Sequence, residues 1–121
     1  MKKIRVGVIG LGFIGKQHVE ALRRLPYMEI VAGSDSNLSM REWCEKNGIQ
    51  KYYSDYKEML TNENMDVVHN CTPNNFHYEV SCEILKTGCH VYSEKPLTIK
   101  SVEGESLIEL ADKKGLKTAV N

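Results

Sequence analysis

The sequence has no excess of charge of either sign, because 16 basic and 16 acidic residues are interspersed along its 121 positions and give a formal net charge of zero. This balance leaves no basic patch for nucleic acid and no attraction to an anionic membrane surface, so we expect neither partner. The longest apolar stretch is interrupted by Arg5 and by glycines, and it is too short to span a bilayer.

The N-terminal residues lack the long apolar segment and the small-residue cleavage site of a signal peptide, so we expect a cytoplasmic location. Closely spaced cysteine pairs are absent as well. The four cysteines form no C-x-x-C motif, and each falls within an expected helix or strand: Cys44, Cys71, Cys82 and Cys89. We expect buried free thiols, with no metal site and no disulfide.

Strand and helix patterns alternate from end to end of a chain whose length supports one domain. The pattern predicts strands near residues 4–9, 29–34, 51–53, 66–71, 89–93 and 116–120. It predicts helices near residues 13–25, 37–47, 55–62, 76–87 and 99–114. Such alternation with short connections indicates a parallel sheet that is covered by helices on both faces.

Several local signals refine these boundaries. Three expected helices end directly before a glycine that can adopt the left-handed conformation, at Gly48, Gly88 and Gly115. Candidate N-caps of the later helices are Ser54 or Asp55, Asn74 or Asn75, and Thr98. The expected sheet-facing stripe of the first helix consists of Ile14, His18, Ala21, Leu22 and Leu25. Packing is the expected role of the aromatic residues Trp43, Tyr52, Tyr53 and Tyr56.

The strand at 4–9 leads into a turn with the spacing G-x-G-x-x-G, at Gly10, Gly12 and Gly15. The first glycine permits a tight turn, the second lets the backbone approach a pyrophosphate, and the third lets the next helix pack closely on the strand. The N–H groups and the positive dipole end of that helix then face the phosphates. Asp35 ends the next apolar run, about 20 residues further on, where a carboxylate can accept hydrogen bonds from the adenosine ribose.

This order of strand, turn, helix, strand and acid predicts dinucleotide binding by an α/β fold of the Rossmann type, a doubly wound parallel sheet of about six strands. Two other interpretations use the same residues. The turn could be a strand-to-helix connection without a ligand, with Asp35 as a helix N-cap. A methyltransferase that binds S-adenosylmethionine also has a glycine turn and an acid, but it has no pyrophosphate for the third glycine to serve.

Two further loops follow expected strands and should open at the same edge of the sheet as the glycine turn. The first contains Thr72, Pro73, Asn74 and His77, and the second contains Glu94 and Lys95. The polar side chains of the first loop could bond cofactor ribose or amide groups. Beside an oxidised nicotinamide the charge of the lysine would be disfavoured, which would suit it for proton exchange with a substrate hydroxyl. The alternative is an exposed charged loop.

These motifs together resemble the N-terminal domain of the glucose–fructose oxidoreductase / inositol dehydrogenase family (Gfo/Idh/MocA). The resemblance covers essentially the whole chain. The residues that carry it are Gly10-Leu11-Gly12-Phe13-Ile14-Gly15 with His18, Thr72-Pro73-Asn74 with His77, and Gly88-Cys89-His90-Val91 leading to Glu94-Lys95-Pro96. The Glu-Lys-Pro step is far more specific than the glycine motif.

The resemblance implies binding of NAD or NADP and oxidation or reduction of a sugar, cyclitol or related polyol. It assigns Lys95 to the substrate and the nicotinamide and Glu94 to cofactor positioning, and it implies a cis Lys95–Pro96 bond. Structural roles are expected for His18, His69 and Asn70. The expected cofactor-binding set is Gly10, Gly12, Phe13, Ile14, Gly15, Asp35, Ser36, Thr72, Pro73, Asn74, His77, Glu94, Lys95 and Asn121.

Members of this family continue into a larger α/β domain that forms the substrate wall. By this resemblance, residues 1–121 correspond to the cofactor domain of a longer enzyme that associates into a homo-oligomer through the other domain. We expect residues 1–121 alone to fold, to bind cofactor weakly and to turn over little or no substrate.

Asp35 favours NAD over NADP, because a carboxylate would repel a 2′-phosphate. No arginine directly follows it, and Arg41 lies about one helical turn further on. Two other functions stay open. The parent protein could be a glycosidase that oxidises a sugar transiently, eliminates a glycosidic bond and reduces the product. It could also be a non-catalytic module that responds to NAD.

Overall fold

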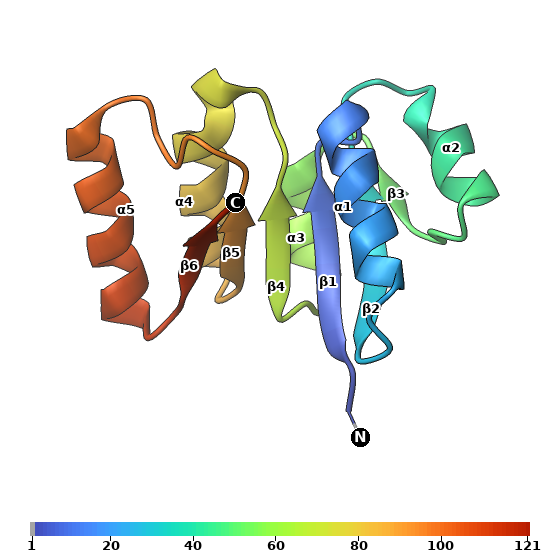
Figure 1. Cartoon of the computed structure of the whole chain (residues 1–121), viewed down its shortest axis with the longest axis horizontal. Helices are drawn as coiled ribbons and strands as arrows, with labels where there is room; N and C mark the ends of the chain where they lie inside the picture. Colours follow the sequence, from blue (N-terminus) through green and yellow to red (C-terminus); the bar gives the residue numbers. More distant parts are fainter. Residues whose placement is uncertain (1) are drawn as a thin grey trace.

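Six parallel strands form one sheet in the order β3-β2-β1-β4-β5-β6 in the computed structural model, which describes residues 2–121. The strands are β1 (Ile4–Ile9), β2 (Met28–Ser34), β3 (Tyr52–Tyr53), β4 (Val67–Asn70), β5 (His90–Ser93) and β6 (Thr118–Val120). The chain leaves β1 toward β2 on one side and later returns to place β4 on the other side (Figure 1). This reversal of strand order beside β1 creates the crevice in which open α/β sheets bind ligands.

Helices cover both faces of the sheet, as predicted. They are α1 (Phe13–Arg23), α2 (Met40–Lys46), α3 (Tyr56–Asn62), the short 3₁₀ helix η1 (Asn74–Phe76), α4 (His77–Lys86) and α5 (Ser101–Lys114). Helices α1 and α2 pack with β1 around one core, to which Val6, Val8, Val19 and Cys44 belong. Helices α3, α4 and α5 pack on the opposite face around a second core, which includes Met59, Ile84 and Leu107.

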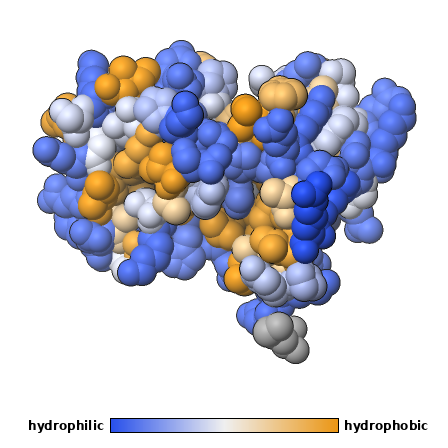
Figure 2. All heavy atoms as spheres, in the orientation of Figure 1, coloured by the Kyte–Doolittle hydropathy of each residue, from blue (hydrophilic) through white to orange (hydrophobic). Residues whose placement is uncertain are grey.

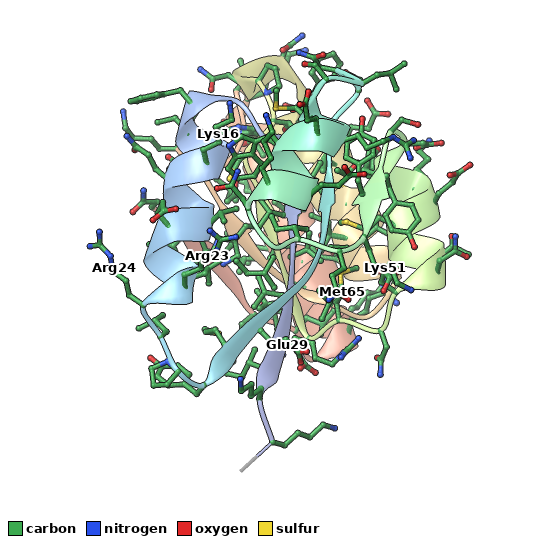
Figure 3. The ribbon with its side chains drawn as sticks, turned by 90° about the vertical axis from the view of Figure 1, so that its right-hand side faces the viewer. Lys16, Arg23, Arg24, Glu29, Lys51 and Met65 are labelled. Carbon is green, nitrogen blue, oxygen red and sulfur yellow. The ribbon has the colours of Figure 1, made fainter. Side chains whose placement is uncertain are left out.

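The face that carries α1 and α2 is only partly covered. In Figure 1 these helices lie over β1, β2 and β3, whereas no helix of the described residues lies in front of β4, β5 and β6. Figure 2 shows hydrophobic surface on this side beside α5 and β6, and again around the lower part of β1. Figure 3 shows Arg24 directed away from the body of the protein at the end of α1, while Arg23 lies on the side of α2.

The first helix presents a different stripe from the predicted one. Its buried residues are Gly15, His18, Val19 and Leu22. A Cβ atom on Gly15 would collide with the carbonyl oxygen of Gly10, so this face of the helix lies directly against the end of β1. The close contact rotates the neighbouring residues outward, and Ile14 is 40% exposed. The stripe through Ile14, Ala21 and Leu25 was therefore wrong, and only His18 and Leu22 belong to the buried face.

The starts of three helices also differ from the prediction. Helix α2 begins at Met40 because Asp35 and Asn37 accept hydrogen bonds from backbone N–H groups two residues further on, and these local bonds compete with a helix. Asp35 is thus no helix N-cap, and neither Asn74, Asn75 nor Thr98 caps α4 or α5, whose N-cap residues are Phe76 and Lys100.

Other local predictions are confirmed. Asp55 is the N-cap of α3 and accepts a hydrogen bond from Lys57 N. Gly48, Gly88 and Gly115 have positive φ at the ends of α2, α4 and α5, and the Lys95–Pro96 bond is cis. All four cysteines are free, although only Cys44 and Cys89 are fully buried. Among residues 2–121, no helix combines the length and the apolar character needed to cross a membrane.

Candidate functional site

A cleft of about 970 Å³ opens at the carboxyl ends of β1, β2, β4 and β5. Its volume is at the upper end of the range for small-molecule and cofactor sites. The glycine turn, the end of β2, the loop after β4 and the Glu94-Lys95 loop all contribute to its lining. Every member of the predicted cofactor-binding set lines the cleft except Gly15 and Asn121. The fold thus brings together three motifs that are far apart in the sequence.

The glycine turn has the geometry of a phosphate cradle. Gly10 has φ +91°, and a side chain there would run into the backbone of Cys71 and Thr72. Gly12 is different, since a Cβ atom at this position would have nothing within 4 Å and would instead occupy the cleft. No side chain caps the start of α1. The N–H groups of its first turn are therefore available to an anion such as a diphosphate.

Asp35 closes the turn from the side of β2. Its Oδ2 accepts a hydrogen bond of 2.7 Å from Leu11 N, and its Oδ1 accepts one of 2.8 Å from Asn37 N. Each carboxylate oxygen can accept more than one hydrogen bond, so Asp35 retains acceptor capacity toward a ribose. The carboxylate thus holds the glycine turn in place while it lines the cleft.

The loop after β4 is organised by a buried side chain that replaces an apolar residue of the strand. Asn70 Oδ1 accepts hydrogen bonds from Thr72 N and Thr72 Oγ1, while its Nδ2 donates to Ser81 Oγ and to the carbonyl oxygen of His77. The polar Asn70 therefore has partners for both ends of its amide. These hydrogen bonds of Asn70 hold the Thr72 loop, which lines the cleft.

His77 connects this loop to the next one. Its side chain is buried, with Nδ1 at 2.6 Å from the carbonyl oxygen of Pro96 and Nε2 at 2.7 Å from that of Thr72. The imidazole thus bridges the loop after β4 and the loop after β5, both of which line the cleft. Both of its ring nitrogens lie against protein atoms, although the residue itself contributes to the cleft lining.

The Glu94-Lys95 loop supplies the charged groups at the far end of the cleft. Lys95 is exposed, and it is the only cationic side chain among the described residues that line the cleft. Glu94 is half-buried, and a hydrogen bond from His18 lowers the pKa of its carboxyl, while partial burial opposes this shift. Glu94 Oε1 lies 2.7 Å from His18 Nε2 and 2.9 Å from Asn121 Nδ2. Asn121 thus reaches Glu94 and is not itself part of the lining.

Several lining residues were not predicted from the sequence as site residues, among them Ser54, Asp55, Tyr56 and Glu79. The first three follow β3 at the same sheet edge, so their position in the chain could have indicated them. Glu79 lies inside α4, where only the tertiary structure shows it. Cys71 also lines the cleft, but burial, with a smaller effect of Glu94, raises the pKa of its thiol to about 12. This thiol is therefore neutral and unreactive near neutral pH.

Fold and cleft together define a dinucleotide-binding domain of the Rossmann class. Residues 4–121 match the model of an oxidoreductase family described as having an NAD-binding Rossmann fold, GFO_IDH_MocA. The chain belongs to this family, which confirms the resemblance found from the sequence motifs.

Named relatives agree with this assignment. The chain is 37% identical over 107 residues to the myo-inositol 2-dehydrogenase of Thermotoga maritima, covering 88% of this chain and 32% of the relative. It is 36% identical over 114 residues to the D-glucoside 3-dehydrogenase of Escherichia coli, covering 93% of this chain and 32% of the relative. The chain thus spans about a third of the length of the curated relatives it matches.

Solved structures share the fold over nearly the whole chain. The WlbA dehydrogenase of Bordetella pertussis, in complex with NADH and UDP-GlcNAcA, has a TM-score of 0.92 at 29% identity, covering 99% of this chain and 35% of its own. The scyllo-inositol dehydrogenase of Lactobacillus casei, with bound NAD(H) and scyllo-inositol, has a TM-score of 0.93 at 24% identity, covering 99% and 36%. The second likeness shows the fold alone.

Proposed function

We propose that this chain is the cofactor domain of a longer enzyme that transfers a hydride between NAD and a sugar, cyclitol or related polyol. The observation that carries the proposal is the meeting of the glycine turn, the Thr72 loop and the Glu94-Lys95 loop at one cleft. The names of the relatives, which include inositol and glucoside dehydrogenases, support the substrate class.

We propose one orientation of the dinucleotide in the cleft. Its diphosphate would lie on the uncapped start of α1, and its adenosine ribose would lie beside Asp35, which directly follows β2. The nicotinamide half would then extend past the Thr72 loop toward Glu94 and Lys95. When bound, the nicotinamide supplies the hydride acceptor or donor.

Lys95 is the proposed residue for the proton transfer that accompanies hydride transfer. Its Nζ would take the hydroxyl proton when the carbinol carbon is oxidised and would return it in the opposite direction. Glu94 would accept hydrogen bonds from the cofactor and keep it in register with the lysine. The other members of the predicted set that line the cleft, including Ser36 and Asn74, would contact the cofactor along it.

Asp35 makes NAD the proposed cofactor in preference to NADP. A 2′-phosphate in this position would meet a carboxylate, and Asp55 and Glu79 add two further acidic side chains to the cleft lining. The cytoplasmic location and the association of the parent protein through another domain stay predictions.

The proposal is tested by replacing Lys95 in the full-length protein. Lys95→Ala should lower turnover of polyol substrates about 10²- to 10⁴-fold, because proton transfer by a positioned side chain contributes that much. The Kd for NAD should change less than about threefold. Lys100→Ala is the matched control, since Lys100 is also exposed and lies outside the cleft lining.

The products distinguish the other candidate functions. Accumulation of NADH with a polyol substrate supports a dehydrogenase, whereas release of sugar without net NADH would indicate a glycosidase. A Lys95→Ala protein that keeps a partner-linked activity would indicate a non-catalytic NAD-responsive module, whereas an enzyme should lose turnover and still bind NAD. For residues 1–121 alone, we expect NADH binding without turnover, and turnover in the ordinary enzyme range of roughly 1–10³ s⁻¹ would contradict the need for another domain.

A further inference from the structure

A chain of hydrogen-bonded side chains lies behind Glu94, outside the cleft. His18 on α1 stands between Glu94 and His69 on β4, with His18 Nε2 at 2.7 Å from Glu94 Oε1 and His18 Nδ1 at 2.8 Å from His69 Nδ1. Both imidazoles are 8% exposed. Neither histidine is among the residues that line the cleft.

The proton positions in this chain follow from what each atom can do. An ionised carboxylate only accepts hydrogen bonds, so His18 Nε2 must carry the proton that it shares with Glu94. When His18 is neutral, its Nδ1 carries the lone pair and can only accept. In that state the donor toward His18 is His69 Nδ1–H. Burial, and to a smaller degree His18, lowers the pKa of His69 to about 4, which agrees with a neutral imidazole in this place.

Packing fixes the two rings. His69 stacks on Tyr92 of β5 with ring centroids 4.7 Å apart, and His18 lies edge-on to His69 with centroids 5.1 Å apart. From the other side, Asn121 donates to Glu94 Oε1 and accepts a hydrogen bond of 3.3 Å from Tyr92 O–H. Elements α1, β4, β5 and the end of β6 therefore all contribute to holding one carboxylate.

Both side-chain donors meet the same oxygen of Glu94, which is Oε1. The second oxygen, Oε2, retains acceptor capacity for a ligand in the cleft that Glu94 lines. Such a carboxylate is aimed before the ligand arrives, so the cofactor does not have to order it on binding.

We propose that His18 is a positioning residue for the nicotinamide half of the cofactor, and that His69 acts through it by fixing the tautomer that donates to Glu94. This inference rests on the proposed role of Glu94 and deepens it. It requires that His18 and His69 matter for a ligand that reaches Glu94 and not for one that occupies only the adenosine end of the cleft.

The experiment compares NADH with AMP as ligands of the 121-residue chain, using titration calorimetry. His18→Leu should weaken NADH binding about tenfold and leave AMP binding within about twofold, because AMP lacks the nicotinamide ribose. His18→Gln, which restores an N–H donor, should recover most of the loss. His69→Phe keeps a ring against Tyr92 but removes the donor, and it should weaken NADH binding by a smaller factor of about three.

His90→Gln is the matched control. This histidine lies at the opposite end of β5 from Glu94, and its Nδ1 accepts a hydrogen bond from Lys117 N. The His90→Gln variant should bind both ligands like the wild type. Equal losses for NADH and AMP in His18→Leu would overturn the proposal, since they would indicate a general structural role. An unchanged NADH affinity would overturn it as well.

A measurement on the unmodified chain does not depend on whether the variants fold. Long-range ¹H–¹⁵N NMR spectra near pH 7 should show His18 as the Nε2–H tautomer and His69 as the Nδ1–H tautomer. A proton on His69 Nε2 instead would refute the proposed relay. Failure of the full-length protein to oxidise polyols would contradict the proposed substrate class but would leave the NADH-to-AMP comparison unchanged, so the two failures are distinguishable.

Discussion

The two ends of the cleft are built in different ways. The proposed adenosine end consists of the Gly10–Gly15 turn and the short segment after β2, with Asp35 hydrogen-bonded to Leu11 N and Asn37 N. The proposed nicotinamide end depends on residues that are far apart in the sequence, since Glu94 is held by His18 from α1 and by Asn121, which follows β6.

This difference separates two tasks. In the proposed binding mode, the adenosine end binds through backbone N–H groups and one carboxylate, which need only a correct local conformation. The nicotinamide end must hold a carboxylate and a lysine in a fixed direction, and that requires support from several elements. Variants at the adenosine end should therefore change the affinity for any adenosine ligand or the stability of the fold. Variants at the nicotinamide end should change the affinity for NADH but not for AMP.

The largest effect on the first end is expected for Gly15→Ala. Its methyl group would collide with the carbonyl oxygen of Gly10, where neither backbone can move without separating α1 from β1. We expect a loss of stability of about 3 kcal/mol. Thermal unfolding should show a fall in Tm of roughly 10 °C.

Gly12→Ala is the matched comparison, because its methyl group would enter open space in the cleft. We expect the free energy of unfolding of this variant to lie within about 0.5 kcal/mol of the wild-type value. Its affinity for NADH should be at least tenfold weaker. Equal destabilisation by both substitutions would show that the two glycines do not have separate roles.

The histidines that support Glu94 at the nicotinamide end should make the stability of the fold depend on pH, through His69. The pKa of His69 is about 4 in the folded protein, against an ordinary value of 6.5, so the folded state disfavours its protonation. As the pH falls from about 6.5 toward 4, the unfolded chain binds this proton first, and stability decreases by about 3 kcal/mol. Urea unfolding of the wild type and of His69→Phe should show that the variant loses less stability in this window.

Protonation of Glu94 also lowers stability, but at lower pH than protonation of His69. Its pKa is lowered from 4.5, first by the hydrogen bond from His18, so its contribution is lost only as the pH falls below that value. A His69→Phe protein with an unaltered slope between pH 6.5 and 4 would contradict the neutral, buried state of His69.

The smallest effect concerns the choice between cofactors. Asp35→Asn removes the negative charge but keeps an acceptor near Leu11 N, so the fold should persist. We expect the ratio of NADPH to NADH affinity to rise about tenfold, because the repulsion of a 2′-phosphate decreases. Asp112→Asn, on the exposed outer part of α5, is the control. A wild-type domain that binds NADPH more tightly than NADH would contradict the role given to Asp35.

Local sequence patterns predicted most of the fold. The alternation of apolar runs and the glycines at helix ends located each strand and each α-helix of the described residues, with errors of a few residues at their ends, but not the 3₁₀ helix η1. The errors at α2 and α4 have local causes: the hydrogen bonds of Asp35 and Asn37 delay one helix, and a 3₁₀ turn over Asn74–Phe76 precedes the other. A pattern of apolar residues does not report such side-chain-to-backbone bonds.

The cleft was predicted better at its adenosine end than around Glu94. The G-x-G-x-x-G spacing carries its own physical reason, whereas a histidine within a helix or a strand has no local signature of its partner. His18 and His69 are 51 positions apart, and only the tertiary structure brings their Nδ1 atoms to 2.8 Å from each other. The polar residues in a strand of otherwise apolar character were a signal that partners exist, but the sequence did not show which partners.

The most direct test of the central claim is a crystal structure of this chain with NADH. We expect the diphosphate at the N–H groups that follow Gly12, the adenosine ribose hydrogen-bonded to Asp35 and the nicotinamide beside Glu94 and Lys95. An empty cleft at saturating NADH, or a dinucleotide bound with its diphosphate away from the start of α1, would contradict it.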